Sequence, residues 1–274
     1  MAPGDNEVTD FRMDRELLVR VISALILVPV VIAIIFTGGQ TFNILVGLTS
    51  TVMAYEWIRM IGVKINWVVP LTSFWAASMA ITLTAWSGDE FLILTTSAII
   101  IGGALWIAGI SAQRALIVWS GLGIIYIFVP IASFLWLRAL PDGAMWLLWT
   151  LLVVWAADVG GYFAGRIIGG RKLIPTISPN KTWAGFIGGT LLAGVAGLLG
   201  AVIGGFGNPF VFFMIGSLAG IWSQVGDAVE SAIKRHFGVK DTGNIIPGHG
   251  GLLDRIDGLL FLAPAVMVGH LLVT

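Results

Sequence analysis

The sequence has no cysteine and little charge, and each shortage excludes a class of protein. Without cysteine there can be no disulfides, thiolate metal sites or cysteine nucleophile. Fifteen Lys and Arg residues balance fifteen Asp and Glu residues, so the basic excess typical of nucleic-acid-binding proteins is missing. Any metal must therefore be bound by oxygen or imidazole ligands, and we expect no nucleic-acid partner.

The apolar residues define the class. They make up 57% of the chain, against about 45–50% in soluble domains. A spanning helix needs about 20 mostly apolar residues, and the chain divides into nine such runs. We therefore predict an all-α, polytopic integral membrane protein. The expected spans are 17–37, 41–61, 66–86, 91–111, 115–137, 144–166, 186–205, 209–231 and 252–273.

The positions of the basic residues predict the orientation. With nine spans, 14 Lys and Arg residues fall on one side of the membrane and only Arg138 falls on the other. Basic residues collect on the cytoplasmic side, so we expect a cytoplasmic N-terminus and an outer C-terminus. Residues 1–10 are acidic, and we expect no cleavable signal.

Two long loops, 166–185 and 232–251, fall on the predicted cytoplasmic side and flank the last three spans. We therefore divide the chain into an N-terminal transmembrane scaffold, 1–140, and a C-terminal catalytic region, 141–274. No internal repeat is evident, whereas many secondary transporters contain inverted repeats.

The densest polar segment is 231–257, which reads SAIKRHFGVKDTGNIIPGHGGLLDRID between two apolar runs. Asp254 and Asp257 are three residues apart, so a helix would direct both carboxylates to one side. Together with Asp227 they would repel one another unless a metal or a proton neutralised them. Mg²⁺ binds a few carboxylates together with water and substrate phosphates. The segment therefore indicates a site for a divalent metal and a nucleotide.

The alternative is an ordinary salt-bridge network, in which the carboxylates of the 254–257 turn pair with Arg255 and Lys240. Such a network would not require the glycines and proline of 247–251, which let the backbone approach a ligand closely. His249 can be a general base, a hydrogen-bond donor to phosphate or a turn residue, and we favour contact with substrate.

The other long loop contains a second set of candidate ligands. Its cations could bind phosphate oxygens, and its hydroxyl and amide side chains offer neutral hydrogen bonds. Lys181 precedes a predicted helix start, where anions are favoured. The alternative is contact with anionic lipid heads. The candidates are Arg166, Lys172, Ser178, Asn180 and Lys181.

Two acidic residues lie within apolar spans. Asp158 is costly at such a position, which favours a polar, water-accessible site, although it could simply pair with a cation. Glu56 is a weaker candidate, because Arg59 follows three residues later and can pair with it.

The segment 231–257, with SPNKTW at 178–183 and the run 158–166, resembles the signature of phosphatidate cytidylyltransferases, also called CDP-diacylglycerol synthases. The resemblance covers residues 150–258 and departs from the family at Ala184, where relatives often carry Glu or Gln. The matching positions of the main segment are Ser231, Ile233, Lys234, Arg235, Lys240, Asp241, Gly243, Ile246, Pro247, His249, Gly250, Gly251, Leu252, Asp254, Arg255, Ile256 and Asp257.

The resemblance implies that phosphatidate attacks the α-phosphorus of CTP, releasing pyrophosphate and leaving CDP-diacylglycerol in the bilayer. Phosphatidate supplies its own ionised phosphate oxygen, so no strong base is required. The resemblance also implies Mg²⁺, with a second metal ion left open, and a homodimer in the bacterial inner membrane whose active site faces the cytoplasm.

The same resemblance implies three groups of site residues. The metal ligands are Asp227, Asp254 and Asp257. The catalytic residues are Asp227, Lys240, Asp241, His249 and Asp254, with Asp241 in a supporting role. The substrate-binding residues are Arg166, Lys172, Ser178, Asn180, Lys181, Ser231, Lys234, Arg235, Gly250, Gly251 and Arg255.

Two other functions remain open. A CTP-dependent lipid or polyprenol kinase would use a similar site but would transfer the γ-phosphate and leave CDP. A transporter of an anionic solute would also place charges between helices, although it has no need for carboxylates joined to a glycine-rich turn.

Overall fold

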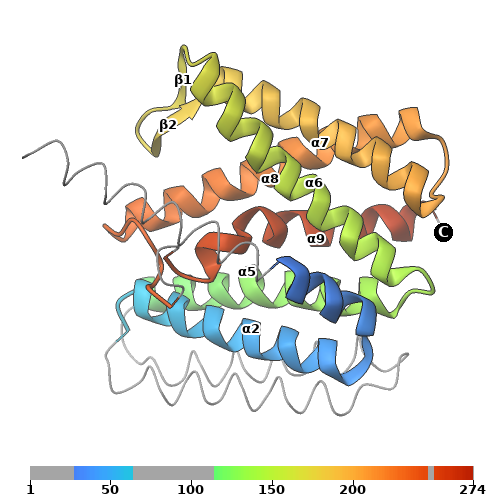
Figure 1. The fold of residues 1–274 in the computed structure, drawn as a ribbon. Coiled ribbons are helices and arrows are strands. Elements are labelled where there is room, and N and C mark those ends of the chain that lie inside the picture. Colours follow the sequence, from blue (N-terminus) through green and yellow to red (C-terminus); the bar gives the residue numbers. More distant parts are fainter. Residues whose placement is uncertain (1–27, 64–113, 246–249, 274) are drawn as a thin grey trace, which may run out of the picture.

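The computed structural model describes residues 28–63, 114–245 and 250–273 as a bundle of long helices with one small hairpin (Figure 1). A short apolar helix, Val28–Thr37, precedes the first long one. The labelled elements are α2 (Gly39–Met60), α5 (Arg114–Ala139), α6 (Gly143–Ile167), β1 (Lys172–Ile174), β2 (Ser178–Thr182), α7 (Trp183–Gly204), α8 (Pro209–His236) and α9 (Leu253–Val273).

Five helices, α5 to α9, are long and apolar enough to cross a membrane. These five, the short first helix and α2 overlap seven of the nine predicted spans. The other two predicted spans, 66–86 and 91–111, lie outside the described residues. The expectation of a helical membrane protein is therefore confirmed, whereas the number of nine spans stays a prediction.

The loop 166–185 contains a short hairpin that the sequence did not predict. Its strands pair antiparallel, with Lys172 opposite Thr182 and Ile174 opposite Ser178. The strands have only three and five residues, too few for their alternation to stand out from the surrounding polar sequence. The hairpin places Ser178, Asn180 and Lys181, three of the predicted ligands of this loop, directly before the start of α7.

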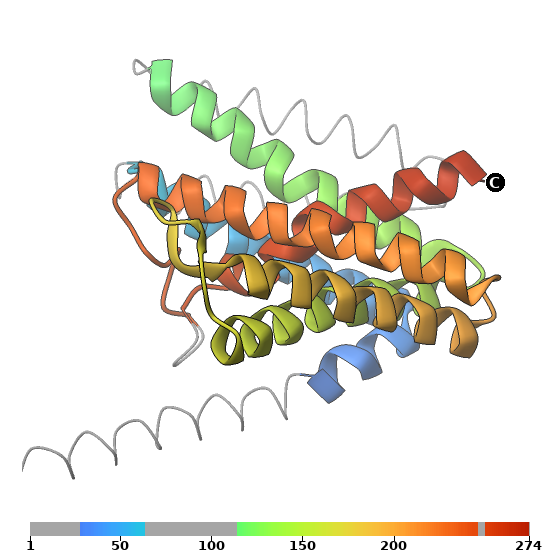
Figure 2. The ribbon, with the colours of Figure 1, turned by 90° about the horizontal axis from the view of Figure 1, so that it is seen from above.

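Helices α6, α7 and α8 pack side by side (Figure 2), and glycines set the separation of α6 from α7. A Cβ atom on Gly160 would lie 2.6 Å from the carbonyl oxygen of Gly188. A Cβ atom on Gly185 would lie 2.7 Å from that of Gly161. Small residues let membrane helices approach closely, where van der Waals packing holds them together. The hairpin side of α6 is thereby fixed against the beginning of α7.

Side-chain caps set where two of these helices begin. Thr182 precedes α7, and its Oγ1 accepts a hydrogen bond of 3.1 Å from the Gly185 amide. Asn208 precedes α8 in the same way and accepts from the Phe210 amide at 2.9 Å. Each cap satisfies an amide that has no partner within its own helix. The cap at Thr182 also fixes the position of Lys181, one residue earlier.

Helix α8 continues to His236, so the loop predicted from residue 232 begins five residues later. The span was predicted to end at 231 because hydrophobicity falls there. Hydrophobicity indicates which residues lie in the membrane, and the helix continues beyond them. Lys234, Arg235 and His236 occupy the last turn, where basic side chains complement the negative end of the helix dipole. Lys234 and Arg235 are therefore held on a rigid element and not on a loop.

The polar elements meet at one end of the bundle. Figure 1 shows the hairpin, the end of α8 and the beginning of α9 on the same side, with the end of α2 nearby. At the opposite end, Gly143 begins α6 directly after the short connection from α5. The two long loops of the sequence thus approach one another in space.

Candidate functional site

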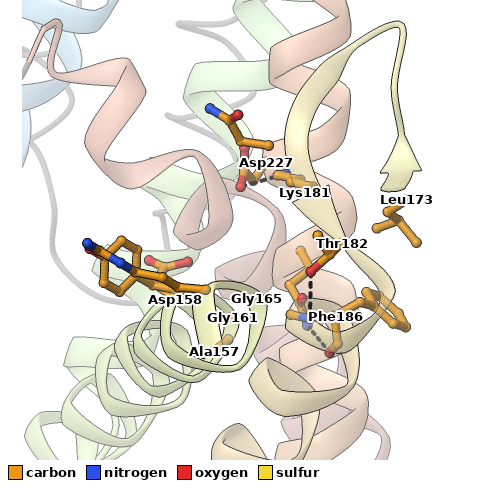
Figure 3. A pocket seen from close by; sticks show the side chains of 14 residues that line it. Ala157, Asp158, Gly161, Gly165, Leu173, Lys181, Thr182, Phe186 and Asp227 are labelled. Carbon is orange, nitrogen blue, oxygen red and sulfur yellow. Dashed lines mark hydrogen bonds and ion pairs between the residues drawn. The ribbon is translucent and has the colours of Figure 1, made fainter. Parts of the chain in front are cut away.

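A pocket of about 460 Å³ lies between α6, the hairpin, α7 and α8 (Figure 3). We call it the charged pocket, and its charged lining residues are Asp158, Arg166, Lys181 and Asp227. Glycines of α6, among them Gly161, line part of its wall and leave the space open. Its volume lies within the range of about 300–1,000 Å³ that is typical of small-molecule sites.

An ion pair joins two sides of the charged pocket. Lys181 Nζ, from the hairpin, is 2.7 Å from Asp227 Oδ2 on α8. The two side chains are 25% and 32% exposed, but the Lys181 Nζ atom itself is buried in this pair. Ser231, one turn further along α8, donates a hydrogen bond of 3.3 Å to Asp227 Oδ1. The structure thus brings Lys181 together with Asp227 and Ser231, although Ser231 lies 50 residues later in the sequence.

Asp158 of α6 faces the same space as this pair. It lies within electrostatic range of Asp227, Lys181 and Arg255. Asp257 of α9 in turn lies within range of Asp158, Asp227 and Glu230. Asp158 lines the pocket together with Lys181, which agrees with the expectation that it belongs to a polar site.

These carboxylates are of the chemical type that binds a divalent cation. The described residues nevertheless contain no group of three Asp, Glu or His side chains close enough to bind one ion. Asp158, Asp227, Asp257 and Glu230 share one electrostatic neighbourhood. Such an excess of negative charge at a membrane boundary is costly unless a cation neutralises it. The available ligands are all oxygen, which Mg²⁺ prefers.

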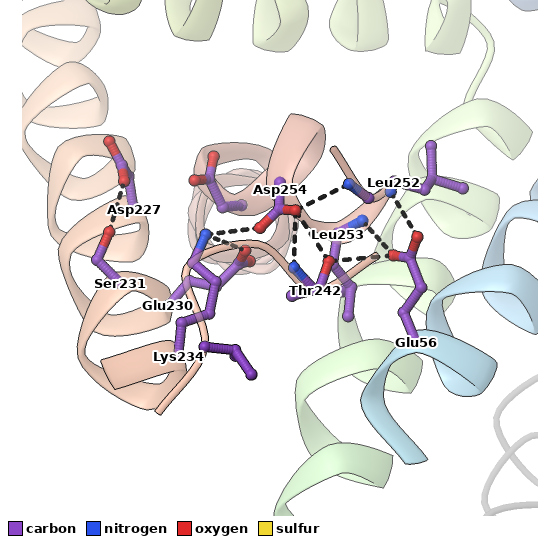
Figure 4. A network of polar contacts seen from close by, with 12 residues as sticks. Glu56, Asp227, Glu230, Ser231, Lys234, Thr242, Leu252, Leu253 and Asp254 are labelled. Atoms are coloured by element: carbon purple, nitrogen blue, oxygen red, sulfur yellow. Dashed lines mark hydrogen bonds and ion pairs between the residues drawn. The ribbon is translucent and has the colours of Figure 1, made fainter. Parts of the chain in front are cut away.

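Asp254 lies in a second group of contacts, which we call the buried network (Figure 4). Its Oδ1 is 2.6 Å from Lys234 Nζ, and its Oδ2 accepts from the Thr242 and Gly251 amides at 2.9 Å each. The side chain is 3% exposed. Both oxygens are therefore already engaged, and the metal role predicted for Asp254 stays a prediction.

Lys234 completes the buried network on α8. Besides Asp254, it contacts Glu230 Oε1 at 3.2 Å, and Glu230 Oε2 accepts a hydrogen bond of 2.8 Å from the Tyr126 hydroxyl. Tyr126 stands on α5, so these contacts connect three helices. The salt-bridge alternative had paired Asp254 with Arg255 or Lys240, but its partner is Lys234.

Sequence reasoning missed Glu56, which belongs to the buried network and not to a pair with Arg59. Glu56 is 1% exposed and accepts hydrogen bonds of 2.9 Å from the amides of Leu252 and Leu253. Arg59 instead donates to the Tyr55 hydroxyl at 3.2 Å. The only signal in the sequence was a carboxylate within an apolar run, the same signal that singled out Asp158.

The remaining cations of the prediction lie around these two groups. Arg166 donates to the Tyr162 hydroxyl at 2.6 Å, at the edge of the charged pocket. Arg235 donates to the carbonyl oxygens of Ile177 and Val239, so it joins the end of α8 to the hairpin turn. Lys172 is exposed on β1.

Of the predicted loop residues, Lys240 and Asp241 are exposed. Asp241 lies beside Gly250, where an added Cβ would be 3.6 Å from the Asp241 Cγ. Ser178 lies on β2, and Asn180 of the same strand lines the charged pocket. His249 lies outside the described residues, so its predicted contact with substrate stays a prediction.

Fold and site together define a class of protein. The chain is a helical membrane protein in which cations and carboxylates gather at one end of the spanning helices, around a pocket suited to phosphate groups. More particularly, it belongs to the cytidylyltransferase family, because the model of that family matches residues 18–273.

Curated relatives cover nearly the whole chain. A phosphatidate cytidylyltransferase of Brucella suis is 35% identical over 250 residues, which are 89% of each chain. That of Bacillus subtilis is 32% identical over 265 residues, 89% of this chain and 94% of the relative. That of Staphylococcus haemolyticus is 32% identical over 254 residues, 91% and 97% of the two chains. The similarity therefore extends beyond the motif into the N-terminal part.

Proposed function

We propose that the protein transfers the cytidylyl group of CTP to phosphatidate. A phosphate oxygen of phosphatidate forms a bond to the α-phosphorus of CTP, the bond between the α-phosphorus and the bridging oxygen breaks, and pyrophosphate leaves. The products are CDP-diacylglycerol and pyrophosphate. The observation that carries the proposal is the charged pocket, in which Lys181 and Asp227 meet at the end of membrane-spanning helices.

The charged pocket offers charged and polar side chains that can bind a nucleoside triphosphate. Both substrates are anionic, so their approach is unfavourable unless positive charge offsets it. The buried Lys181 ammonium has no partner besides Asp227 among the described residues, so a phosphate oxygen in the pocket would compete with Asp227 for it. Arg166 and Asn180 line the same pocket and add donors. Catalysis would then rest on positioning and on stabilising the leaving pyrophosphate.

Mg²⁺ is part of the proposal. Asp227 and Asp257 would hold it, with Asp158 close by, because these carboxylates share one neighbourhood and Asp227 is already open to the pocket. Bound Mg²⁺ would neutralise charge on the phosphates. Asp254 would support this arrangement by holding the beginning of α9, on which Asp257 lies one turn later.

A separate cavity supports a lipid substrate. It has a volume of about 370 Å³, and its lining comes from the first helix and from α2, α5, α6 and α9. Almost all the lining side chains are apolar, and Arg255 is the charged one. Arg255 also lies within electrostatic range of Asp158 in the charged pocket. An acyl chain in the apolar cavity would thus leave its phosphate near Arg255, between the two spaces.

The orientation follows from the same end of the bundle. Arg59, Arg166, Lys181 and Lys234 all lie at or near that end, whereas Arg138 lies in the last turn of α5 at the other. By the positive-inside rule, the charged pocket faces the cytoplasm, where CTP is available. We further propose that the protein lies in the bacterial inner membrane and acts as a homodimer.

The test uses purified protein in micelles with phosphatidate, Mg²⁺ and CTP labelled separately at the α and γ positions. We expect the α label in the lipid fraction and the γ label in released pyrophosphate. If the γ label enters the lipid instead, the protein is a lipid kinase. If neither label moves with folded protein, the cytidylyltransferase proposal fails, and uptake of an anion into sealed vesicles without CTP would indicate a transporter.

A further inference from the structure

Glu56 connects the N-terminal half of the chain to the glycine-rich loop before α9. Its Oε1 accepts from the Leu252 amide and its Oε2 from the Leu253 amide, each at 2.9 Å (Figure 4). Helix α9 begins at Leu253, so both donors belong to the group of amides that a helix start leaves without internal partners. A carboxylate from α2 therefore caps α9, almost 200 residues away in the sequence.

The carboxylate fits into a space that two glycines leave free. A Cβ atom on Gly243 would lie 2.7 Å from Glu56 Oε1, and one on Gly251 would lie 2.8 Å from the same atom. Both distances are shorter than a carbon and an oxygen tolerate without displacement. An internal carboxylate thus accounts for both glycines, whereas for Gly251 the sequence had suggested close approach to a ligand.

Thr242 joins Glu56 to Asp254. Its Oγ1 lies 3.3 Å from Glu56 Oε2 and 3.1 Å from Asp254 Oδ2, so its hydroxyl can donate to either carboxylate. Asp254 also accepts from the amides of Thr242 and Gly251. The two carboxylates therefore hold the same loop from opposite sides, and Lys234 ties Asp254 to α8.

We infer that Glu56 is a positioning residue for the reaction, a role that rests on the proposed function. Glu56 does not line the charged pocket and acts through the backbone of the loop. By fixing the beginning of α9, it sets the position of Asp257 relative to Asp227, and thereby the pair of carboxylates proposed to bind Mg²⁺. Groups that orient metal ligands typically contribute about 10- to 100-fold to affinity or activity.

The test compares Glu56→Gln with Glu56→Asp in the full-length protein. Glutamine keeps the size of the side chain, but in either orientation its amide nitrogen faces a backbone N–H of Leu252 or Leu253. We expect kcat to fall about 10- to 100-fold, with the KM for CTP unchanged because the charged pocket is intact. Aspartate retains two acceptors and should recover part of the loss.

Hydrogen exchange supplies a readout that does not depend on turnover. The amides of Leu252 and Leu253 should exchange faster in Glu56→Gln and regain protection in Glu56→Asp. Arg59→Gln is the matched control, because Arg59 lies in the same helix, is exposed and bonds only Tyr55 among the described hydrogen bonds. It should leave both kcat and exchange unchanged.

Wild-type kcat in Glu56→Gln would overturn the inference. So would a loss that follows the amount of folded protein alone and is no smaller in Glu56→Asp. If Glu56→Gln does not fold, Thr242→Val decides, since it removes the hydroxyl between the two carboxylates: lower kcat at unchanged KM for CTP supports the inference, and wild-type kcat contradicts it. A wild-type protein that makes no CDP-diacylglycerol would defeat the proposed function, while the exchange result would still test the cap.

Discussion

The charged pocket and the buried network lie at the same end of the molecule, but their charged side chains differ in exposure and in the number of their partners. In the pocket, Lys181 and Asp227 are 25% and 32% exposed and are held mainly by each other. In the network, Asp254 and Glu56 are 3% and 1% exposed, and each accepts several hydrogen bonds from backbone and side chains. Charges with few partners can exchange one of them for a ligand, whereas charges with several partners hold the backbone in place.

The difference divides one continuous motif into two roles. Asp227 belongs to the pocket, whereas Lys234, only seven residues later on the same helix, belongs to the network. A motif match alone cannot separate residues that contact substrate from those that position them. The following substitutions test that division, beginning with the largest expected effect.

Asp227→Asn should reduce turnover most, by about 100- to 1,000-fold, because it removes a charge that faces the reacting groups. Asparagine keeps the shape and can still accept from Ser231. Folding and the protection of the amides around Asp254 should be unchanged, as measured by thermal unfolding and hydrogen exchange. Turnover near that of the wild type would place Asp227 outside the site.

Asp254→Asn should also reduce turnover severely, but by disturbing the loop. The asparagine amide would face either the Lys234 ammonium or the backbone N–H groups of Thr242 and Gly251. Removing one partner of a buried ion pair costs about 3–5 kcal/mol, although Lys234 keeps Glu230 and the protein should still fold. The temperature of thermal unfolding should fall together with the activity, which distinguishes this variant from Asp227→Asn.

Lys181→Ala should raise the KM for CTP about tenfold, the loss of about 1.4 kcal/mol expected for one charge-assisted contact. Arg171→Ala is the matched control, because it removes an exposed cation that stands directly before the neighbouring strand and does not line the charged pocket. The two variants should be compared by initial rates over a range of CTP concentrations. An equal effect of both would mean that general positive charge, and not the pocket, attracts CTP.

Thr182→Ala should have the smallest effect. It removes the cap at the start of α7, which is worth about 1 kcal/mol of stability. Activity at low temperature should be close to that of the wild type, and thermal unfolding should occur a few degrees lower. A large loss of activity at low temperature would show that the cap positions Lys181 for catalysis.

Much of the fold was predictable, because a membrane imposes a length and a composition on each helix. The runs from 115 to 273 became helices within a few residues of the expected ends. The errors fell where hydrophobicity stops being informative: the end of α8, which continues past the apolar run, and the hairpin of 172–182, whose strands are too short to show a period.

The candidate site was predictable in part. Asp158 was chosen as a costly charge within an apolar span, Lys181 as a cation before a helix start and Asp227 as a metal ligand, and the structure gathers them in one pocket. Glu56 raised the same signal but was assigned to Arg59, because a neighbour at i+3 was the only partner visible in the sequence. Periodicity predicts contacts within a helix but does not predict contacts between helices that are distant in the sequence.

The sequence by itself determined that the protein is a membrane protein of many helices, where its charges stand along the chain, and which family signature they form. These properties are local, since they depend on composition, spacing and the length of apolar runs. Only the tertiary structure decided which charges face the pocket and which are saturated by partners. That decision depends on packing between α2, α8 and α9, which no local pattern specifies. It brought Glu56 to the beginning of α9, where Thr242 joins it to Asp254.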